Sequence, residues 1–237
     1  MRVALLTTDG PPARRCAQVL AETYDLAAII VRTKVPSLPF ETSHPFDAEQ
    51  TAYESETWFG GTSPGLGDFA SVAPVLDMTE DGVAETLRAS GTDVAIVLDG
   101  GPVGTAPRDL MGTRMIVLHG ADPQDYRGED VHLWATYHGE ENRLECVVQQ
   151  AAAEVNTGPV LFAARPDIPA GMALRELRRA TTDTCITGAM KALHYFANGG
   201  MLSVNQLHRQ GKLYSPMPAA LKDYCISRFT QRAEGAS

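Results

Sequence analysis

Residues 117–128, VLHGADPQDYRG, decide the fold that the sequence predicts. Two apolar residues precede His119, and a polar loop rich in turn-forming residues follows it. We therefore expect His119 to end a buried strand and to face a loop. There its side chain can transfer a proton or donate a hydrogen bond to a developing oxyanion. Tyr126, Arg127 and Gly128 then supply a planar cation and a hinge before the next predicted helix.

Apolar runs and amphipathic stretches alternate on both sides of this loop. Continuous apolar runs predict strands that are buried on both faces, and a period near 3.6 predicts helices. The predicted strands are 3–7, 26–31, 94–98, 115–119, 144–149 and 160–163, and the predicted helices are 13–22, 83–90, 131–138, 173–197 and 219–232. The alternation predicts an α/β protein with an open, mostly parallel twisted sheet and helices on both faces. Because ligands of such sheets bind beyond the carboxyl ends of the strands, we expect the site near Leu98 and His119.

The chain divides into an α/β domain over 1–200 and a helical C-terminal appendage with a tail over 201–237. Residues 33–75 contain five prolines and four glycines and interrupt the alternation. We interpret this stretch as an insertion with one short helix near 47–59. Two roles stay open for it, a lid that closes over a ligand and a variable surface loop. We expect the last five residues to be disordered.

Composition excludes several classes of protein. Hydrophobic residues make up 44% and charged residues 21% of the 237, as in globular proteins. No apolar run is long enough to span a membrane, and the N-terminus lacks the pattern of a signal peptide. The net charge of −9 argues against binding to nucleic acid.

The four cysteines are far apart and form no Cys-x-x-Cys pair, which favours a reduced cytoplasmic compartment. No histidine or cysteine spacing predicts a metal site, so we expect none. We therefore expect a cytoplasmic protein that binds a small molecule, without nucleic acid or membrane partners. A homodimer is compatible with the sequence, which does not determine the oligomeric state.

The ordered motifs resemble the folate-dependent formyltransferase family, which includes glycinamide ribonucleotide, methionyl-tRNA and sugar formyltransferases. In that family a strand ends in Asn-x-His, a loop ends in Tyr-Arg-Gly, a helix carries Trp-Ala, and an Asp-Thr-Gly-Pro turn follows. Here His119, 126–128, 134–135 and 156–159 match in order, and the resemblance covers about residues 1–195 without 33–75. It implies the family's α/β fold, a formyl-tetrahydrofolate donor and an amine on a small-molecule acceptor.

Two departures from the family pattern affect the chemistry. The family catalyses with Asn, His and Asp, whereas Val117 and Asn156 stand at the Asn and Asp positions here. Valine cannot donate to an oxyanion, and loss of one such donor costs about 10²–10³ in rate. Asparagine cannot take a proton, and general acid–base catalysis contributes about 10²–10⁴. Asp122, on the loop after His119, is a candidate for a relocated carboxylate.

The candidate site has a catalytic and a binding part. The catalytic candidates are His119, Asn156 and Asp122. The binding candidates, several of them implied by the resemblance, are Leu98, Asp99, Gly100, Gly101, Val117, Tyr126, Arg127, Thr157 and Gly158. The glycines at 100–101 leave the backbone open to a ligand, as the family's pterin loop does, or only form a turn that ends the strand. The role of the Asp99 charge stays open.

The function that these residues predict is transfer of a formyl group from a formyl-tetrahydrofolate-type donor to an amine of a small molecule, by a divergent member of the family. Two alternatives remain, because Val117 and Asn156 replace two of three catalytic residues. One is another group-transfer, condensation or hydrolytic enzyme on the same fold, and the other is a catalytically silent binding protein.

Overall fold

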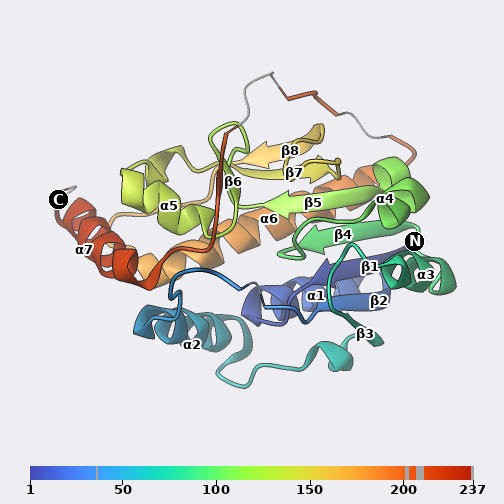
Figure 1. Ribbon diagram of the computed structural model, residues 1–237, viewed down its shortest axis with the longest axis horizontal. Coiled ribbons are helices and arrows are strands. Elements are labelled where there is room, and N and C mark those ends of the chain that lie inside the picture. The colour runs from blue at the N-terminus through green and yellow to red at the C-terminus, as the bar shows by residue number, and fades with distance from the viewer. Residues whose placement is uncertain (36, 201–202, 207–210, 236–237) are drawn as a thin grey trace.

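A seven-stranded mixed sheet forms the centre of the molecule (Figure 1). The structure is a computed structural model that describes residues 1–35, 37–200, 203–206 and 211–235. The strand order is β3-β2-β1-β4-β5-β7-β8, where the first five are parallel and β7 and β8 run antiparallel to their neighbours. The strands are β1 Arg2–Thr7, β2 Asp25–Arg32, β3 Val72–Val75, β4 Val94–Leu98, β5 Met115–His119, β7 Cys146–Gln150 and β8 Val160–Ala164. The predicted open, mostly parallel α/β sheet is confirmed.

Helices cover both faces of this sheet. On one face α1 (Pro11–Thr23) and α6 (Leu174–Ala197) pack on alternate strand residues such as Leu5 and Leu118. On the other face α3 (Asp81–Ala89) and α4 (Thr105–Met111) pack on the intervening residues, among them Leu6 and Val97. Helix α4 was not predicted from the sequence. Three short 3₁₀ helices complete the connections at Leu66–Asp68, Gly112–Arg114 and Glu141–Arg143.

A third apolar cluster lies beyond the carboxyl end of the sheet. It joins α5 (Val131–His138), α7 (Ala219–Gly235), part of α6 and Phe46 of α2 (Pro45–Phe59). Figure 1 shows α5, α7 and α2 together on this side of the molecule. The C-terminal part of the chain therefore shares a core with the residues that follow His119.

A second, two-stranded sheet brings the C-terminal part of the chain back to the loop after β5. Strand β6 (Tyr126–Gly128) pairs in parallel with β9 (Lys212–Tyr214). These strands were not predicted, because three residues are too few for a hydrophobic period to show. This pairing fixes the Tyr-Arg-Gly segment against a segment that lies more than 80 residues later in the sequence.

Residues 33–75 contribute to the domain itself. The short helix expected near 47–59 is present as α2, and residues 72–75 form the edge strand β3. Glu54 of α2 is fully buried and binds Arg178 of α6 through two hydrogen bonds of 2.8 and 2.7 Å. Trp58 Nε1 donates to Asp183 of the same helix. In this structure α2 is docked on α6.

The predicted disorder of the last five residues is wrong for three of them, because α7 extends through Gly235. The final two residues lie outside the part of the chain that the structure describes.

Candidate active site

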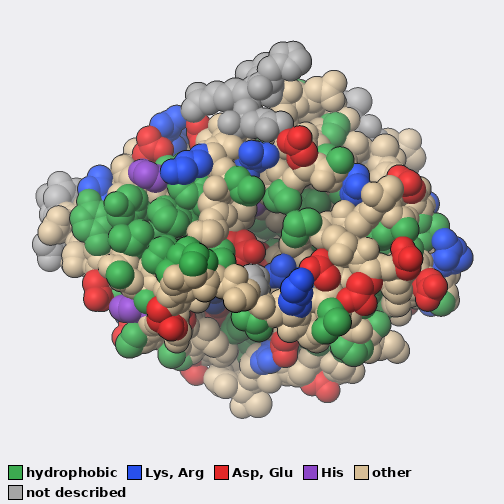
Figure 2. Space-filling view, in the orientation of Figure 1, with side chains coloured by type: hydrophobic (Ala, Val, Ile, Leu, Met, Phe, Trp, Pro, Cys, Tyr) green, Lys and Arg blue, Asp and Glu red, His purple; other side chains and the backbone are tan. Residues whose placement is uncertain are grey.

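A cavity of about 480 Å³ opens at the carboxyl ends of four parallel strands, and we call it the strand-end cavity. Thr8, Arg32, Asp99 and His119 line it at the ends of β1, β2, β4 and β5. From β1 the chain proceeds to β2 and β3 on one side and later to β4 and β5 on the other. This is the position where open α/β sheets bind ligands. Figure 2 shows the surface hollowed in this area, with acidic and basic side chains around the hollow.

Backbone strain is concentrated at this cavity. Among the described residues, three that are not glycine have a positive φ: Asp99 at 55°, Asp130 at 50° and Asn156 at 60°. All three line the strand-end cavity. Each such residue costs on the order of 1–3 kcal/mol, and they gather at ligand and active sites. The strain therefore marks this cavity as the candidate active site.

His119 ends β5 and is 7% exposed. Its Nε2 lies 2.7 Å from the carbonyl oxygen of Tyr126. Because a carbonyl only accepts, Nε2 donates, and in the neutral ring Nδ1 is then an acceptor. Burial lowers the pKa of His119 to about 4, although the bond to Tyr126 opposes this shift. The ring is therefore neutral at pH 7. Within the described residues Nδ1 has no hydrogen-bond partner, so it can accept a proton.

The positions of the two replaced family residues lie in the same cavity. Val117 and Asn156 both line it. The C-terminal segment fixes the Asn156 loop, because Gln206 Nε2 donates to the carbonyl oxygens of Asn156 (3.2 Å) and Gly158 (2.7 Å). The same amide donates to Gln149, which stands opposite Val117 in the β5–β7 ladder. Gln149 is fully buried, and its Nε2 has no partner within the described residues.

The loop after β4 forms another wall. Leu98, Asp99 and the two glycines that follow all line the cavity. A Cβ on Gly101, whose φ is 77°, would lie 2.5 Å from Arg32 Nη1. A side chain at this position would therefore displace the guanidinium of Arg32. The buried Arg32 Nε has no hydrogen-bond partner in the described part of the chain.

The Asp99 side chain is exposed to solvent in the open cavity, although protein atoms surround it on the other sides. Desolvation by this burial raises the pKa of Asp99, the positive charge of Arg178 lowers it, and Asp130 raises it further. Desolvation also raises the pKa of Glu129, whereas Arg32 lowers it. The guanidinium of Arg178 donates two hydrogen bonds to the carboxylate of Glu54, which partly balances its positive charge.

His132 lies on the first turn of α5 and is 5% exposed. It lines the cavity, and burial lowers its pKa to about 3, with further lowering by Arg178 and Lys222. Asp130 occupies the N-cap position of α5, and its Oδ2 accepts from the backbone N–H of Met217.

Five of the residues named from the sequence do not line the cavity. Asp122 Oδ1 accepts from the N–H of Gln124 and stabilises a turn. The Tyr126 hydroxyl donates to Glu140 at 2.6 Å, and Arg127 Nε donates to the Gly211 carbonyl. Thr157 and Gly158 hold the turn after β7, where a Cβ on Gly158 would collide with the backbone of Gln150. These residues support the loops, and the cavity carboxylates are Asp99, Glu129 and Asp130.

Sequence reasoning missed the residues that complete the cavity from distant segments. These are Thr8, Arg32, Arg178, Thr181, Thr182, Cys185, Leu213 and Tyr214. The position of Arg32, directly after the predicted buried strand 26–31, was the available signal.

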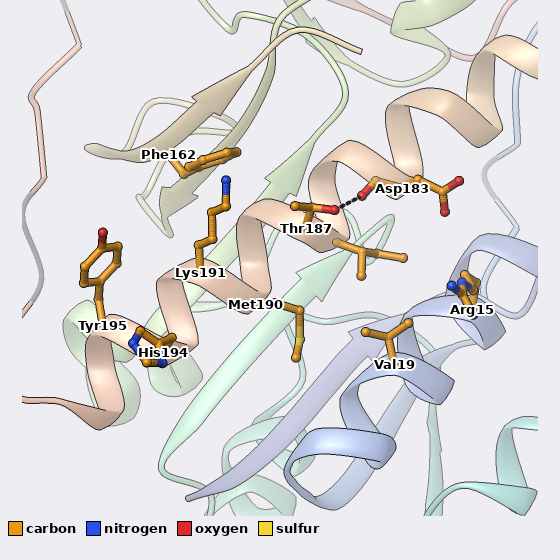
Figure 3. Close-up of a pocket in the computed structure, with 10 residues that line it drawn as sticks. Arg15, Val19, Phe162, Asp183, Thr187, Met190, Lys191, His194 and Tyr195 are labelled. Atoms are coloured by element: carbon orange, nitrogen blue, oxygen red, sulfur yellow. Dashed lines mark hydrogen bonds between the residues drawn. The ribbon is translucent and has the colours of Figure 1, made fainter. Parts of the chain in front are cut away.

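A larger cavity of about 790 Å³ lies between α1, α6 and Phe162 of β8, and we call it the helix cavity (Figure 3). The Lys191 ammonium lies 4.8 Å from the centre of the Phe162 ring, and the Thr187 hydroxyl donates to the Asp183 carbonyl. None of the positive-φ residues above lines this cavity, and no residue named as a site candidate from the sequence does.

Two kinds of feature are absent from the described residues. No group of three or more histidine, cysteine, aspartate or glutamate side chains is placed to hold a metal ion. No helix there has the length and apolar character to cross a membrane.

The sequence matches no protein-family model and no curated protein. Solved structures do match. Glycinamide ribonucleotide transformylase 1 from Symbiobacterium toebii is 17% identical, with a TM-score of 0.59 over 88% of this chain and 92% of that chain. The formyltransferase PseJ from Anoxybacillus kamchatkensis, in complex with UDP-4,6-dideoxy-4-formamido-L-AltNAc and tetrahydrofolate, is 13% identical, with a TM-score of 0.56 over 94% and 89%.

HypX from Aquifex aeolicus, in complex with tetrahydrofolic acid, is 15% identical, with a TM-score of 0.56. The match covers 93% of this chain and 30% of HypX, so this chain spans about a third of that protein. At these identities the likeness concerns the fold. Together with the parallel sheet and the cavity at its switch point, it shows that the chain has the fold of the formyltransferases.

Proposed function

We propose that the chain transfers a formyl group from a folate donor to an amine of a small-molecule acceptor, with His119 handling the proton. The observation that supports this most is the position of His119, whose Nδ1 is available in a strained cavity at the switch point of a formyltransferase fold. Two of the similar structures hold tetrahydrofolate or tetrahydrofolic acid.

The cavity suits a donor of this kind. The glycines at 100–101 leave the backbone of the β4 loop open, so its peptide groups would hold the pterin ring. Arg32, whose Nε has no hydrogen-bond partner among the described residues, lies directly beside this loop. The donor supplies the formyl group when bound. The cavity volume admits only part of a folate molecule together with an acceptor, so the remainder would extend through its mouth.

The reaction requires one net proton movement. The acceptor nitrogen bonds to the formyl carbon, the bond from that carbon to the donor nitrogen breaks, and a proton passes from the acceptor nitrogen to the donor nitrogen. Neutral His119 can take this proton at Nδ1, because Nε2 is committed to Tyr126. Val117 donates nothing to the oxyanion, so we expect slower transfer than with the family's asparagine.

Calorimetric titration with 5-formyl-tetrahydrofolate, followed by assay of formyl transfer to a panel of amines, tests the proposal. We expect micromolar binding, and transfer that is lost in His119→Ala and kept in His194→Ala, a histidine of the helix cavity. Binding without any transfer, with release of formate instead, would favour hydrolysis. Hydrolysis is the second candidate, because a free Nδ1 can equally activate water. Absence of binding by folded protein would refute the folate proposal.

A further inference from the structure

We propose that Gln206 is a positioning residue that holds Asn156 in the strand-end cavity, where the Asn156 amide donates a hydrogen bond to the oxyanion of the reacting formyl group. This inference rests on the proposed function, because it names the donor for the oxyanion that forms in that reaction. Val117 has no group that can donate. The C-terminal part of the chain, 50 residues after Asn156, thereby contributes to the site.

Asn156 carries a group that suits an oxyanion. Attack on the formyl carbon places negative charge on the formyl oxygen until the bond to the leaving nitrogen breaks. Among the described residues that line the cavity, Asn156 is the one with a side-chain amide. An amide nitrogen has two N–H donors, whereas a carboxylate of the same shape only accepts. Within the described part of the chain the Asn156 side chain makes no hydrogen bond, so both donors are free for a ligand.

One nitrogen atom of Gln206 joins the loop of Asn156 to the sheet. This Nε2 donates to the Asn156 carbonyl oxygen at 3.2 Å, to that of Gly158 at 2.7 Å and to Gln149 Oε1 at 2.8 Å. Gln149 lies on β7 and is fully buried. Because a central part of the sheet supplies one of the three oxygens, Gln206 fastens the loop to a rigid support.

The same contacts place Asn156 close to Val117. Gln149 stands directly opposite Val117 in the antiparallel β5–β7 ladder. The side chains of such a pair lie on one face of the sheet, with Cβ atoms about 4.5–5.5 Å apart. His119 points to this face too, because side chains alternate along a strand. Through Gln206 the backbone of Asn156 is therefore held near the end of β5 that carries His119.

The conformation of Asn156 needs support from outside its loop. Residues 151–159 form neither helix nor strand, and Asn156 has a φ of 60°. Inside the loop the Thr157 hydroxyl donates to the Glu154 carbonyl at 3.0 Å. A left-handed residue other than glycine persists where the surrounding structure fixes it. The bond from Gln206 to the Asn156 carbonyl supplies this constraint at the strained residue itself.

A double-mutant cycle tests whether Gln206 acts through Asn156. The reaction is loss of the formyl group from 10-formyl-tetrahydrofolate with the amine panel, measured both as transfer and as release of formate. Asn156→Asp keeps the shape and tolerates positive φ, but cannot donate when ionised, and should lower kcat by about 10²–10³. Gln206→Met removes the three hydrogen bonds without adding a charge and should lower kcat by about tenfold. The double variant should be no slower than Asn156→Asp alone.

The matched control is Gln231→Met, at an exposed position on α7, which should leave kcat unchanged. Gln206→Met should also keep the dissociation constant of 5-formyl-tetrahydrofolate, because the oxyanion exists only during the reaction. A rate in Asn156→Asp equal to or above that of the wild type would refute the donor role. Losses that multiply in the double variant would refute the positioning role, because Gln206 would then act independently of Asn156.

Amide hydrogen exchange tests the hydrogen bonds of Gln206 without any turnover. The Gln150 amide donates to the Pro159 carbonyl at 2.9 Å and closes the base of the loop. The Val160 amide donates to the Val204 carbonyl at 2.8 Å. In Gln206→Met both amides should exchange at least about fivefold faster, whereas the amides of the central strand β4 should not change. Unchanged exchange at both amides would overturn the positioning role.

The two measurements separate this inference from the proposed function. Release of formate without transfer by the wild type would refute formyl transfer, and the double-mutant cycle would still be measured on the release. If the wild type neither transfers nor releases the formyl group, the donor role of Asn156 fails together with the proposed function. Hydrogen exchange then still decides whether Gln206 holds the loop.

Discussion

The strand-end cavity and the helix cavity share helix α6 and differ in almost everything else. The helix cavity is larger, about 790 against 480 Å³, and its carboxylate Asp183 is bound by Arg179 and Trp58. The strand-end cavity holds strained backbone, two carboxylates with raised pKa values and two histidines that burial keeps neutral. Strained backbone therefore distinguishes the two cavities better than volume does.

The largest expected difference between the two cavities concerns catalysis. His119→Ala should reduce formyl transfer by about 10²–10⁴, because the proton acceptor is lost. His194→Ala, in the helix cavity, should leave kcat within experimental error. Steady-state rates of both variants measure this. Equal rates for His119→Ala and the wild type would contradict the role given to His119.

Ion pairs beside the two cavities should differ in stability. Glu54→Gln leaves the Arg178 guanidinium without its buried partner and should reduce the free energy of unfolding by about 3 kcal/mol. Arg179→Met breaks the more exposed pair with Asp183 near the helix cavity and should cost less than about 1 kcal/mol. Urea denaturation compares them. Similar losses would show that the Glu54–Arg178 pair is not specially buried in solution.

The pH dependence of stability should also originate at the strand-end cavity. The pKa values of His119 and His132 lie near 4 and 3 in the folded protein, below the ordinary 6.5. The unfolded chain therefore binds more protons between these limits, and each histidine lowers stability as pH falls from about 6.5 to 4, by up to 1.4 kcal/mol per unit.

The buried carboxylates have raised pKa values and act in the opposite direction, so a difference between variants is more informative. His132→Asn should flatten the curve of unfolding free energy between pH 4 and 6.5, whereas His194→Asn should not. An unchanged slope in His132→Asn would show that this imidazole is protonated in the folded state.

The smallest expected effect compares two glycines. Gly101→Ala and Gly171→Ala both place a side chain at positive φ and should each cost about 1 kcal/mol. Only at Gly101 does the new Cβ meet Arg32, since nothing lies within 4 Å at Gly171. We therefore expect weaker 5-formyl-tetrahydrofolate binding in Gly101→Ala alone. Equal binding in both variants would contradict a role of Arg32 and its neighbouring loop in binding the folate.

The sheet could be predicted from sequence because each central strand is a continuous apolar run. Strands β4 and β5 match the predicted limits, 94–98 and 115–119. Strand β3 was assigned to an insertion, because VAPV is only four residues long and contains a proline, as edge strands tolerate. Helix α4, with seven residues and Pro107 inside it, is equally inconspicuous.

The part of the candidate site at the strand ends could be predicted from the sequence. The part contributed by later, distant segments could not. Val117, His119 and the loop from Leu98 line the cavity because adjacent parallel strands end at one edge. Asp122 was proposed because it is close to His119 in sequence. In the structure its carboxylate accepts a hydrogen bond from the Gln124 N–H within a turn. Glu129, Arg178 and Tyr214 reach the cavity only through packing of α5, α6 and β9, which no local pattern in the sequence reports.

Calorimetric titration of 5-formyl-tetrahydrofolate into the wild type, Val117→Phe and Thr187→Phe tests the central claim most directly. Phenylalanine at 117 fills the strand-end cavity, and phenylalanine at 187 enters the helix cavity. The account predicts micromolar binding by the wild type, at least about tenfold weaker binding by Val117→Phe, and unchanged binding by Thr187→Phe. No binding by the folded wild type, or weakening by Thr187→Phe alone, would contradict it.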